Sequence, residues 1–176
     1  MTVGFAPQVA FDSNAPVCLG AAVVFTNTTT GTPPIAYLWD FGDGITSTLD
    51  SPVYTYTAAG LYTVTLDAVN DFGSGQATGL VEVMETTADF TFVANGLTVT
   101  FTNASQNATS YLWSFGDTGT STETNPVHTY ADAGVYTVTL TVTGVCGTDV
   151  ATQELEVSLP SFQIYLPLIM KATVIP

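Results

Sequence analysis

The chain has 176 residues, of which only 9% are charged, and its single basic residue and fifteen acidic residues give a formal net charge of −14. Because phosphate groups are bound by Lys and Arg, this composition argues against nucleic acid as a partner and disfavours docking on anionic lipid. No apolar run reaches the roughly 18 residues of a transmembrane helix, so we expect no membrane insertion. Thr, Ser and Asn supply most of the polar side chains, a composition that is common among extracellular β proteins. We therefore expect a secreted or cell-surface protein.

Short runs of β-branched and aromatic residues alternate with clusters of Gly, Pro, Asn and Asp, which predicts strands and not helices. In the first half, strands are expected near residues 8–11, 21–26, 35–41, 53–56, 61–70 and 76–84. In the second half, they are expected near residues 89–93, 97–102, 109–115, 127–130, 134–143 and 149–157. Short strands at such regular intervals predict an all-β fold of sandwich type.

The two halves repeat one another. The run Tyr37-Leu38-Trp39-Asp40-Phe41-Gly42-Asp43-Gly44 returns as Tyr111-Leu112-Trp113-Ser114-Phe115-Gly116-Asp117-Thr118. Because self-similarity at a fixed period fixes the architecture, we expect one sandwich at residues 1–84, a second at 85–158 and a tail at 159–176. The join at Met84–Ala88 lacks Gly and Pro, so the two domains should be stiff relative to each other.

Each residue of the repeated motif has an expected structural role. Trp39 and Trp113 should fill the two cores. A glycine permits the tight turn after each tryptophan strand, and the following aspartate should cap backbone N–H groups there. A tyrosine at the start of the longest strand should form a tyrosine corner in each domain. The residues concerned are Phe41, Gly42, Asp43 and Tyr62 in the first repeat, and Phe115, Gly116, Asp117 and Tyr136 in the second.

These motifs resemble the PKD (polycystic kidney disease) domain family. The resemblance rests on Trp-Asp-Phe-Gly-Asp-Gly, Pro-Val-Tyr-Thr-Tyr and Ala-Gly-Leu-Tyr-Thr-Val-Thr-Leu in the first copy and on their counterparts in the second, and it covers roughly residues 8–158. It implies Ig-like sandwiches on an extracellular protein, used in adhesion, surface layers or mechanical spacing, or as a non-catalytic module of a secreted hydrolase. Fold alone does not decide among these uses.

We expect structural roles for the acidic residues of the motif and for the single histidine. Asp43 and Asp117 occupy the same position in different domains and are expected to lie too far apart for a catalytic pair. We expect no metal or other cofactor, although a calcium site using Asp40, Asp43 and Asp50 is an alternative. His128, whose counterpart is Tyr54, is expected to be a half-buried strand residue.

The two cysteines fall in different domains. Cys18 precedes the second expected strand of the first domain, and Cys146 precedes the last strand of the second. Three alternatives stay open: two free buried thiols, a bridge within the chain if the domains fold side by side, or a bridge from Cys18 of one subunit to Cys146 of the next. An extracellular setting favours a bond of some kind.

The tail after Ser158 is apolar on one face. Its alternating residues are expected to form a strand used in assembly, and they are Phe162, Ile164, Leu166, Leu168 and Met170. Burying that face contributes on the order of 10 kcal/mol, whereas ordering 15 residues costs roughly 15–30 kcal/mol. The tail should therefore be ordered only when paired in a sheet, for example that of a neighbouring subunit. Alternatively, it packs on its own domain or serves as a secretion or anchoring signal.

The repeat and the tail together predict a structural subunit of an extracellular filament or surface fibre, assembled head-to-tail, whose partners are other copies of itself. The alternative is a non-catalytic carbohydrate- or protein-binding adhesion module of a larger secreted protein. Side-by-side exposure of Tyr54, Tyr56 or Tyr165 would favour that alternative. An enzyme is not expected, because no acid, base or nucleophile set converges in the sequence.

Overall fold

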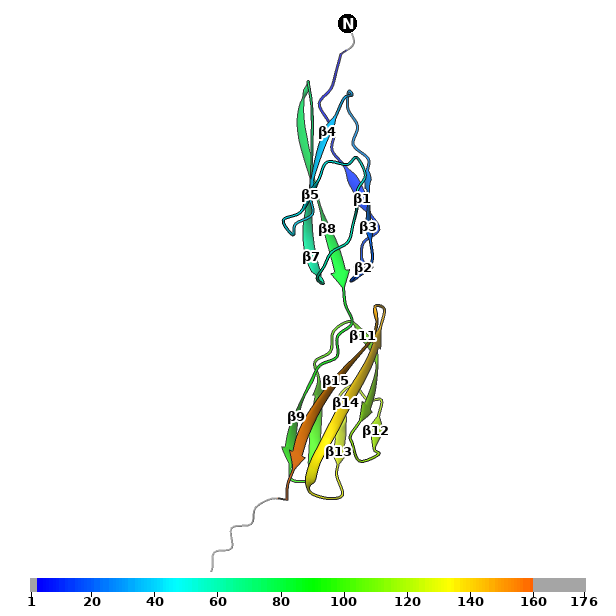
Figure 1. The fold of residues 1–176 in the computed structure, drawn as a ribbon, viewed down its shortest axis with the longest axis vertical. Coiled ribbons are helices and arrows are strands. Elements are labelled where there is room, and N and C mark those ends of the chain that lie inside the picture. Colours follow the sequence, from blue (N-terminus) through cyan, green and yellow to red (C-terminus); the bar gives the residue numbers. More distant parts are fainter. Residues whose placement is uncertain (1–2, 160–176) are drawn as a thin grey trace, which may run out of the picture.

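The structure, a computed structural model, describes residues 3–159, which form two β-sandwiches arranged end to end (Figure 1). All regular elements among these residues are strands. The part of the chain from residue 3 to residue 159 has no helix that could span a membrane. The all-β class and the tandem Ig-like sandwiches are thus confirmed, whereas the expected tail strand falls on residues outside the described range.

The first sandwich consists of two antiparallel layers with one added parallel strand. One layer has the order β1-β3-β6 and the other has the order β2-β8-β7-β4-β5. The strand β2 pairs with β8 in parallel, with Val17 opposite Val83 and Cys18 opposite Met84. The bounds are β1 Phe11–Ser13, β2 Val17–Cys18, β3 Val23–Asn27, β4 Ala36–Asp40, β5 Thr46–Ser47, β6 Val53–Tyr54, β7 Gly60–Asn70 and β8 Gly73–Met84.

The second sandwich repeats this plan without a counterpart of β2. Its layers have the orders β13-β10-β9 and β12-β11-β14-β15. The long hairpin of β14 and β15 is paired from Gly134 opposite Val157 to Gly144 opposite Gly147. The bounds are β9 Phe90–Asn95, β10 Thr98–Asn103, β11 Ala108–Ser114, β12 Thr120–Ser121, β13 Val127–Thr129, β14 Gly134–Gly144 and β15 Gly147–Val157.

Each sandwich buries its own core, because residues on alternate positions of each strand face the opposite layer. A tryptophan lies at the centre of each core, and both Trp39 and Trp113 are fully buried. In the first sandwich, the ring of Phe25 packs at a tilt against both Trp39 and Phe41, and in the second Phe101 packs in the same way against Trp113 and Phe115. The cores are separate clusters, so each sandwich is stabilised largely by its own apolar contacts.

The strand predictions were right for the long elements and incomplete for the short ones. The two-residue strands β2, β5 and β12 were missed, because two residues carry no periodicity from which a strand can be recognised. The first expected strand, residues 8–11, was placed too early. Gln8 forms only an isolated bridge with Thr30, and the paired strand begins at Phe11.

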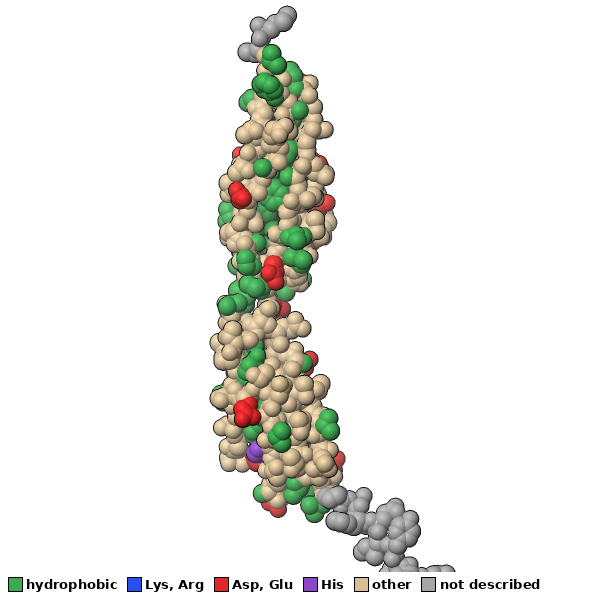
Figure 2. All heavy atoms as spheres, turned by 180° about the vertical axis from the view of Figure 1, so that it is seen from behind, with side chains coloured by type: hydrophobic (Ala, Val, Ile, Leu, Met, Phe, Trp, Pro, Cys, Tyr) green, Lys and Arg blue, Asp and Glu red, His purple; other side chains and the backbone are tan. Residues whose placement is uncertain are grey.

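The surface carries little charge. In Figure 2 the acidic side chains lie singly over both sandwiches, and most of the visible face consists of uncharged polar groups and backbone. Within residues 3–159, the one contact between a basic and an acidic side chain joins His128 to Asp117.

Candidate functional site at the domain junction

The repeated tryptophan motif forms the same turn in each sandwich. The indole N–H of Trp39 donates to the carbonyl of Leu49 at 3.0 Å, and that of Trp113 donates to the carbonyl of Glu123 at 2.9 Å. The glycine that follows has a positive φ, +82° at Gly42 and +86° at Gly116. A Cβ atom at Gly42 would lie 2.5 Å from a backbone oxygen of β7, so the turn requires glycine for its contact as well as for its φ.

The aspartate of each turn has two partners. Asp43 accepts a hydrogen bond from the Ile45 N–H at 3.1 Å and from the Tyr54 hydroxyl at 2.7 Å. The hydrogen bond to Asp43 is the main reason that the pKa of Tyr54 rises to about 12. The aspartates therefore tie the turn to the opposite layer, as well as capping backbone N–H groups.

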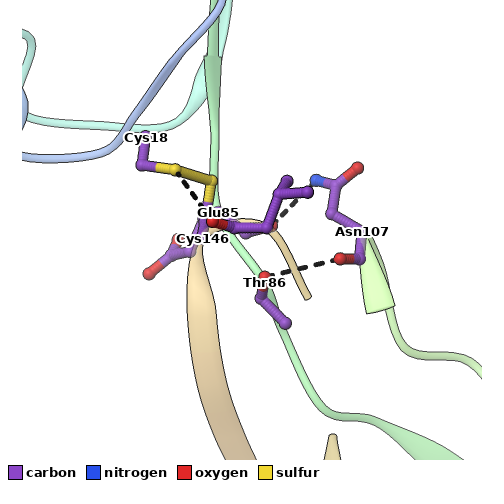
Figure 3. Close-up of a disulfide and its surroundings, with 6 residues drawn as sticks. Cys18, Glu85, Thr86, Asn107 and Cys146 are labelled. Atoms are coloured by element: carbon purple, nitrogen blue, oxygen red, sulfur yellow. Dashed lines mark hydrogen bonds between the residues drawn. A yellow bond between two sulfur atoms is a disulfide. The ribbon is translucent and has the colours of Figure 1, made fainter. Parts of the chain in front are cut away.

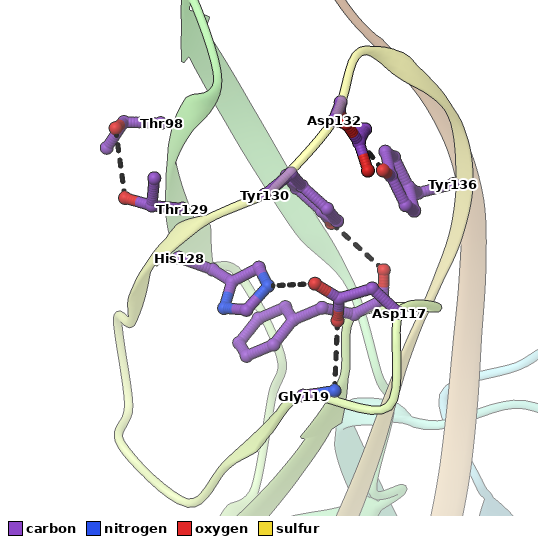
Figure 4. Close-up of polar contacts among 9 residues, drawn as sticks. Thr98, Asp117, Gly119, His128, Thr129, Tyr130, Asp132 and Tyr136 are labelled. Carbon is purple, nitrogen blue, oxygen red and sulfur yellow. Dashed lines mark hydrogen bonds and ion pairs between the residues drawn. The ribbon is translucent and has the colours of Figure 1, made fainter.

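In the second sandwich, His128 stands where Tyr54 stands in the first. Its Nε2 lies 2.7 Å from one oxygen of Asp117, whose other oxygen accepts from the Gly119 N–H at 2.9 Å (Figure 4). Burial of the Asp117 carboxyl opposes its ionisation, but the hydrogen bonds from His128 and Gly119 outweigh burial and lower its pKa. The histidine ring also stacks on Phe115 with centroids 4.1 Å apart, and His128 is half-buried in β13, as expected.

The tyrosines beside these turns fasten connecting loops. Tyr62 donates to the carbonyl of Ala58, and Tyr136 donates to the carbonyl of Asp132, each at 2.9 Å. Tyr56, which is 2% exposed, donates to the carbonyl of Phe41 in the core. Burial raises the pKa of Tyr56, because the ionised phenolate would lose its hydration.

Tyr54 and Tyr56 do not form the exposed, side-by-side pair of rings that would have favoured a carbohydrate- or protein-binding module, because Tyr54 is half-buried and Tyr56 is buried. Tyr54 stacks flat on Phe41 with centroids 4.1 Å apart, and Tyr56 lies edge-on against it inside the sandwich. Tyr56 follows the end of β6, and the alternation of exposed and inward-facing residues continues to it, so Tyr56 faces the core on the same side as Tyr54. Tyr165 lies outside the described residues.

The carboxylates considered for calcium are engaged separately. Asp40 accepts from the Gly42 N–H, Asp43 from Tyr54, and Asp50 from the amide of Asn27. No group of three or more His, Cys, Asp or Glu side chains that could hold a metal ion occurs among residues 3–159.

The two cysteines form a disulfide between the sandwiches. Cys18 lies in β2 at the lower end of the first sandwich, and Cys146 lies in the turn between β14 and β15 at the upper end of the second (Figures 1 and 3). Their Cα atoms are 5.3 Å apart, and they are separated by 128 positions in the sequence. We expected a bridge within the chain only if the two domains lay side by side, and this condition was wrong. The domains lie end to end, and the end of β2 meets the tip of the β14–β15 hairpin at their junction.

The backbone link beside the disulfide is also fixed. The Asn107 amide donates to the carbonyl of Glu85 at 2.8 Å, and Thr87 and Gln106 exchange backbone hydrogen bonds of 3.1 and 2.9 Å (Figure 3 shows Asn107 beside Glu85 and Thr86). On the other side, the Leu19 N–H donates to the carbonyl of Met84 at 2.8 Å. The link is thus held by both sandwiches, with the side chain of Thr86 only 5% exposed.

Two residues of the β14–β15 hairpin complete the junction. A Cβ atom at Gly144 would lie 1.9 Å from the carbonyl oxygen of Asn107, so only glycine permits this approach of backbone to backbone. Asp149 accepts a 2.7 Å hydrogen bond from the N–H of Ala88, and that bond is the first cause of its lowered pKa. Sequence reasoning missed Asn107, Gly144 and Asp149, because none of them belongs to a repeated motif, and only the odd cysteine in each domain pointed to this region.

The assembly residues expected in the tail, Phe162, Ile164, Leu166, Leu168 and Met170, lie outside the described residues. Their role as a strand that pairs with a neighbour therefore stays a prediction.

Comparison with known proteins identifies the family. The profile of the PKD domain matches residues 5–85 and, a second time, residues 83–159. Pre-pro-metalloprotease PrtV of Vibrio cholerae is 45% identical over 56 residues, which are 31% of this chain and 6% of that protein. Collagenase ColA of Bacillus cereus is 67% identical over 33 residues, which are 19% of this chain and 3% of ColA. The chain therefore matches only a small part of the length of these relatives.

A solved structure supports the fold. The Ig1–Ig3 ectodomain of mouse nectin-like molecule 4 has a TM-score of 0.61 at 18% identity, over 93% of this chain and 68% of that one, which is a likeness of fold alone. The profile matches cover both sandwiches and confirm the resemblance seen in the repeated motif. This chain belongs to the PKD domain family, of which it carries two tandem copies.

Proposed function

We propose that this chain is a non-catalytic, extracellular spacer module of a larger protein, which sets the distance and direction between the segments joined to its two ends. The observation that carries the proposal is the doubly connected junction. A backbone link held by hydrogen bonds and a disulfide join the same two sandwiches at different points. Two connections restrict bending and twisting far more than a single flexible linker does.

The relatives support a module within a larger protein. Both are proteases by name, and each matches this chain over 6% of its length or less. In this chain, the acidic and imidazole groups of the repeated turns serve to hold loops, as Asp43 does with Tyr54 and Asp117 with His128. These contacts favour a structural role for the groups that a catalytic site would otherwise use.

The filament subunit predicted from the tail receives no support from the comparisons, which favour the module of a larger secreted protein. Recognition of carbohydrate or protein through an exposed ring at position 56 is not favoured, because Tyr56 is buried. The spacer role therefore fits the described residues better than either a fibre subunit or a glycan-binding module.

Small-angle X-ray scattering of the full chain tests the proposal. With two 11-residue strands in line at about 3.3 Å per residue, plus turns, we expect a rod of roughly 70–80 Å with the cross-section of one sandwich. The Cys18→Ser/Cys146→Ser variant is the matched control, and its distance distribution should broaden while each sandwich stays folded. A broad distribution for the oxidised wild-type chain, equal to that of the variant, would contradict a rigid spacer.

A further inference from the structure

The positions of the two cysteines determine which part of the chain carries a pulling force. When tension acts on the two ends of the chain, it follows the shortest covalent path between them. That path runs from the N-terminus to Cys18, crosses the disulfide, and continues from Cys146 to the C-terminus. Residues 19–145 form a closed loop beside this path and bear no tension through their backbone.

The two branches of the path are already extended. The N-terminal branch, from residue 3 to Cys18, runs along the first sandwich from its upper end to the junction and includes β1 and β2 (Figure 1). The C-terminal branch is β15, an 11-residue strand that runs along the second sandwich from the junction to its lower end. Together they form one line of extended chain along the whole length of the rod.

We propose that the chain is a load-bearing tether of almost fixed length, in which the disulfide diverts tension away from both sandwich cores. The proposal rests on the spacer role and adds a mechanical function to it. An oxidised chain transmits force between the segments at its two ends without unfolding, whereas a reduced chain lengthens by unfolding one sandwich after the other.

The length withheld by the disulfide is large. The cysteines are 128 positions apart, which at about 3.5 Å per residue corresponds to roughly 450 Å of extended chain. The branches can contribute little, because a strand already rises about 3.3 Å per residue and a fully extended chain at most about 3.6 Å. Even if β1 is pulled from β3, we expect a gain of no more than roughly 20 Å over the branch from residue 3 to Cys18.

Without the disulfide, tension passes through the sandwiches themselves. It then enters the first sandwich at β1 and leaves at β8, and it enters the second at β9 and leaves at β15. All the strands between those points lie on the path. Unfolding of one repeat should release roughly 200 Å, once the folded length of a sandwich is subtracted from the extended chain.

Single-molecule force spectroscopy on the full chain, fused at both ends to handle domains of known unfolding length, tests the proposal. For the oxidised chain, we expect handle events but no step of the chain itself above roughly 20 Å. For the same molecules in dithiothreitol, and for Cys18→Ser/Cys146→Ser without reductant, we expect two further steps of roughly 200 Å each. The same two steps in the oxidised chain would overturn the proposal.

Two controls separate this proposal from the spacer role. Thiol counting on the denatured oxidised chain should show no free thiol, and two free thiols per chain would remove the disulfide on which both proposals rest. Steps of roughly 200 Å in an oxidised chain that still gives a narrow scattering distribution would overturn the tether and leave the spacer role standing. The single variants Cys18→Ser and Cys146→Ser should each behave as the double variant does. Retention of the short extension by either single variant would show that something other than the disulfide withholds the length.

Discussion

The two sandwiches have equivalent cores, and one difference between them is the partner of the aspartate in the motif turn. In both, a buried tryptophan, two phenylalanines and two tyrosines occupy equivalent places, and an aspartate ties the motif turn to the opposite layer. The partner of that aspartate is Tyr54 in the first sandwich and His128 in the second, and each ring stacks on the preceding phenylalanine with centroids 4.1 Å apart. A flat ring with a polar atom at one position meets the geometric requirement, so the fold tolerates two different ionisation chemistries at one site.

A second difference lies in the turn itself. Gly44 and Thr118 occupy the same place, and both have a positive φ, +90° and +78° respectively. A β-branched residue in this region is strained, because its side chain crowds the backbone. The second sandwich therefore keeps the backbone of the first at a cost that glycine would avoid.

The largest effect on the free energy of unfolding is expected from removing the buried tryptophan that both sandwiches have. Trp39→Ala and Trp113→Ala should each lower the free energy of unfolding of their own sandwich by about 3–5 kcal/mol, since each removes a fully buried side chain and leaves a cavity. Denaturant titration of each variant should show one early transition and one unchanged transition. A single early transition in both variants would mean that the cores are coupled, contrary to their separation in the structure.

A smaller effect on stability should distinguish His128, the partner of Asp117, from Tyr54, the partner of Asp43. The pKa of Asp117 is lowered in the folded state, so its ionised form contributes stability that is fully present above the unfolded pKa of about 3.9 and is lost as the pH falls through the folded value. His128→Phe keeps the stacking on Phe115 and removes the hydrogen bond. We expect it to lower the free energy of unfolding by about 1 kcal/mol at about pH 5, and by less at about pH 2.

The matched control in the first sandwich is Tyr54→Phe, which removes the hydrogen bond to Asp43. Denaturant titrations at the two pH values compare both variants with the wild-type chain. An equal effect of His128→Phe at both pH values would show that the bond to Asp117 does not depend on the charge of the carboxylate.

The smallest effect on the free energy of unfolding is expected for a substitution that makes the second motif turn more like the first. Thr118→Gly removes the strained residue and should raise the free energy of unfolding of the second sandwich by about 0.5–1 kcal/mol, measured by thermal denaturation. Gly44→Thr in the first sandwich is the reciprocal change and should lower stability by a similar amount. Destabilisation by Thr118→Gly would mean that the threonine side chain contributes more than its backbone strain costs.

The sequence was most informative where it repeats. Trp39 and Trp113, the motif glycines and the long strands could be placed because the same physical requirement appears at each position in two copies. The aspartate caps and tyrosine corners follow from local geometry, which a short stretch of sequence determines. By contrast, alternation places Tyr54 and Tyr56 on one face of the strand but does not say whether that face is buried, and in the structure it faces the core.

The junction could not be derived in the same way. Cys18 lies in a two-residue strand, and Cys146 lies at a hairpin tip, so neither position has a periodic pattern. Whether they meet depends on how two separately folded units are placed, and that placement depends on contacts such as the one between Asn107 and Glu85. Those contacts occur once in the chain, and the repeat therefore gave no second copy from which to recognise them.

The disulfide also changes the consequence of proteolytic cleavage of the backbone. A protease that cleaves the link at Glu85, or any loop between residues 19 and 145, opens the closed loop without separating the molecule, because Cys18 and Cys146 still join its two ends. The segments attached at the termini would remain in one covalent piece after a cut that would divide an unbridged chain into two. Attachment of the two ends then depends on the redox state of the surroundings and not on an intact backbone at the junction.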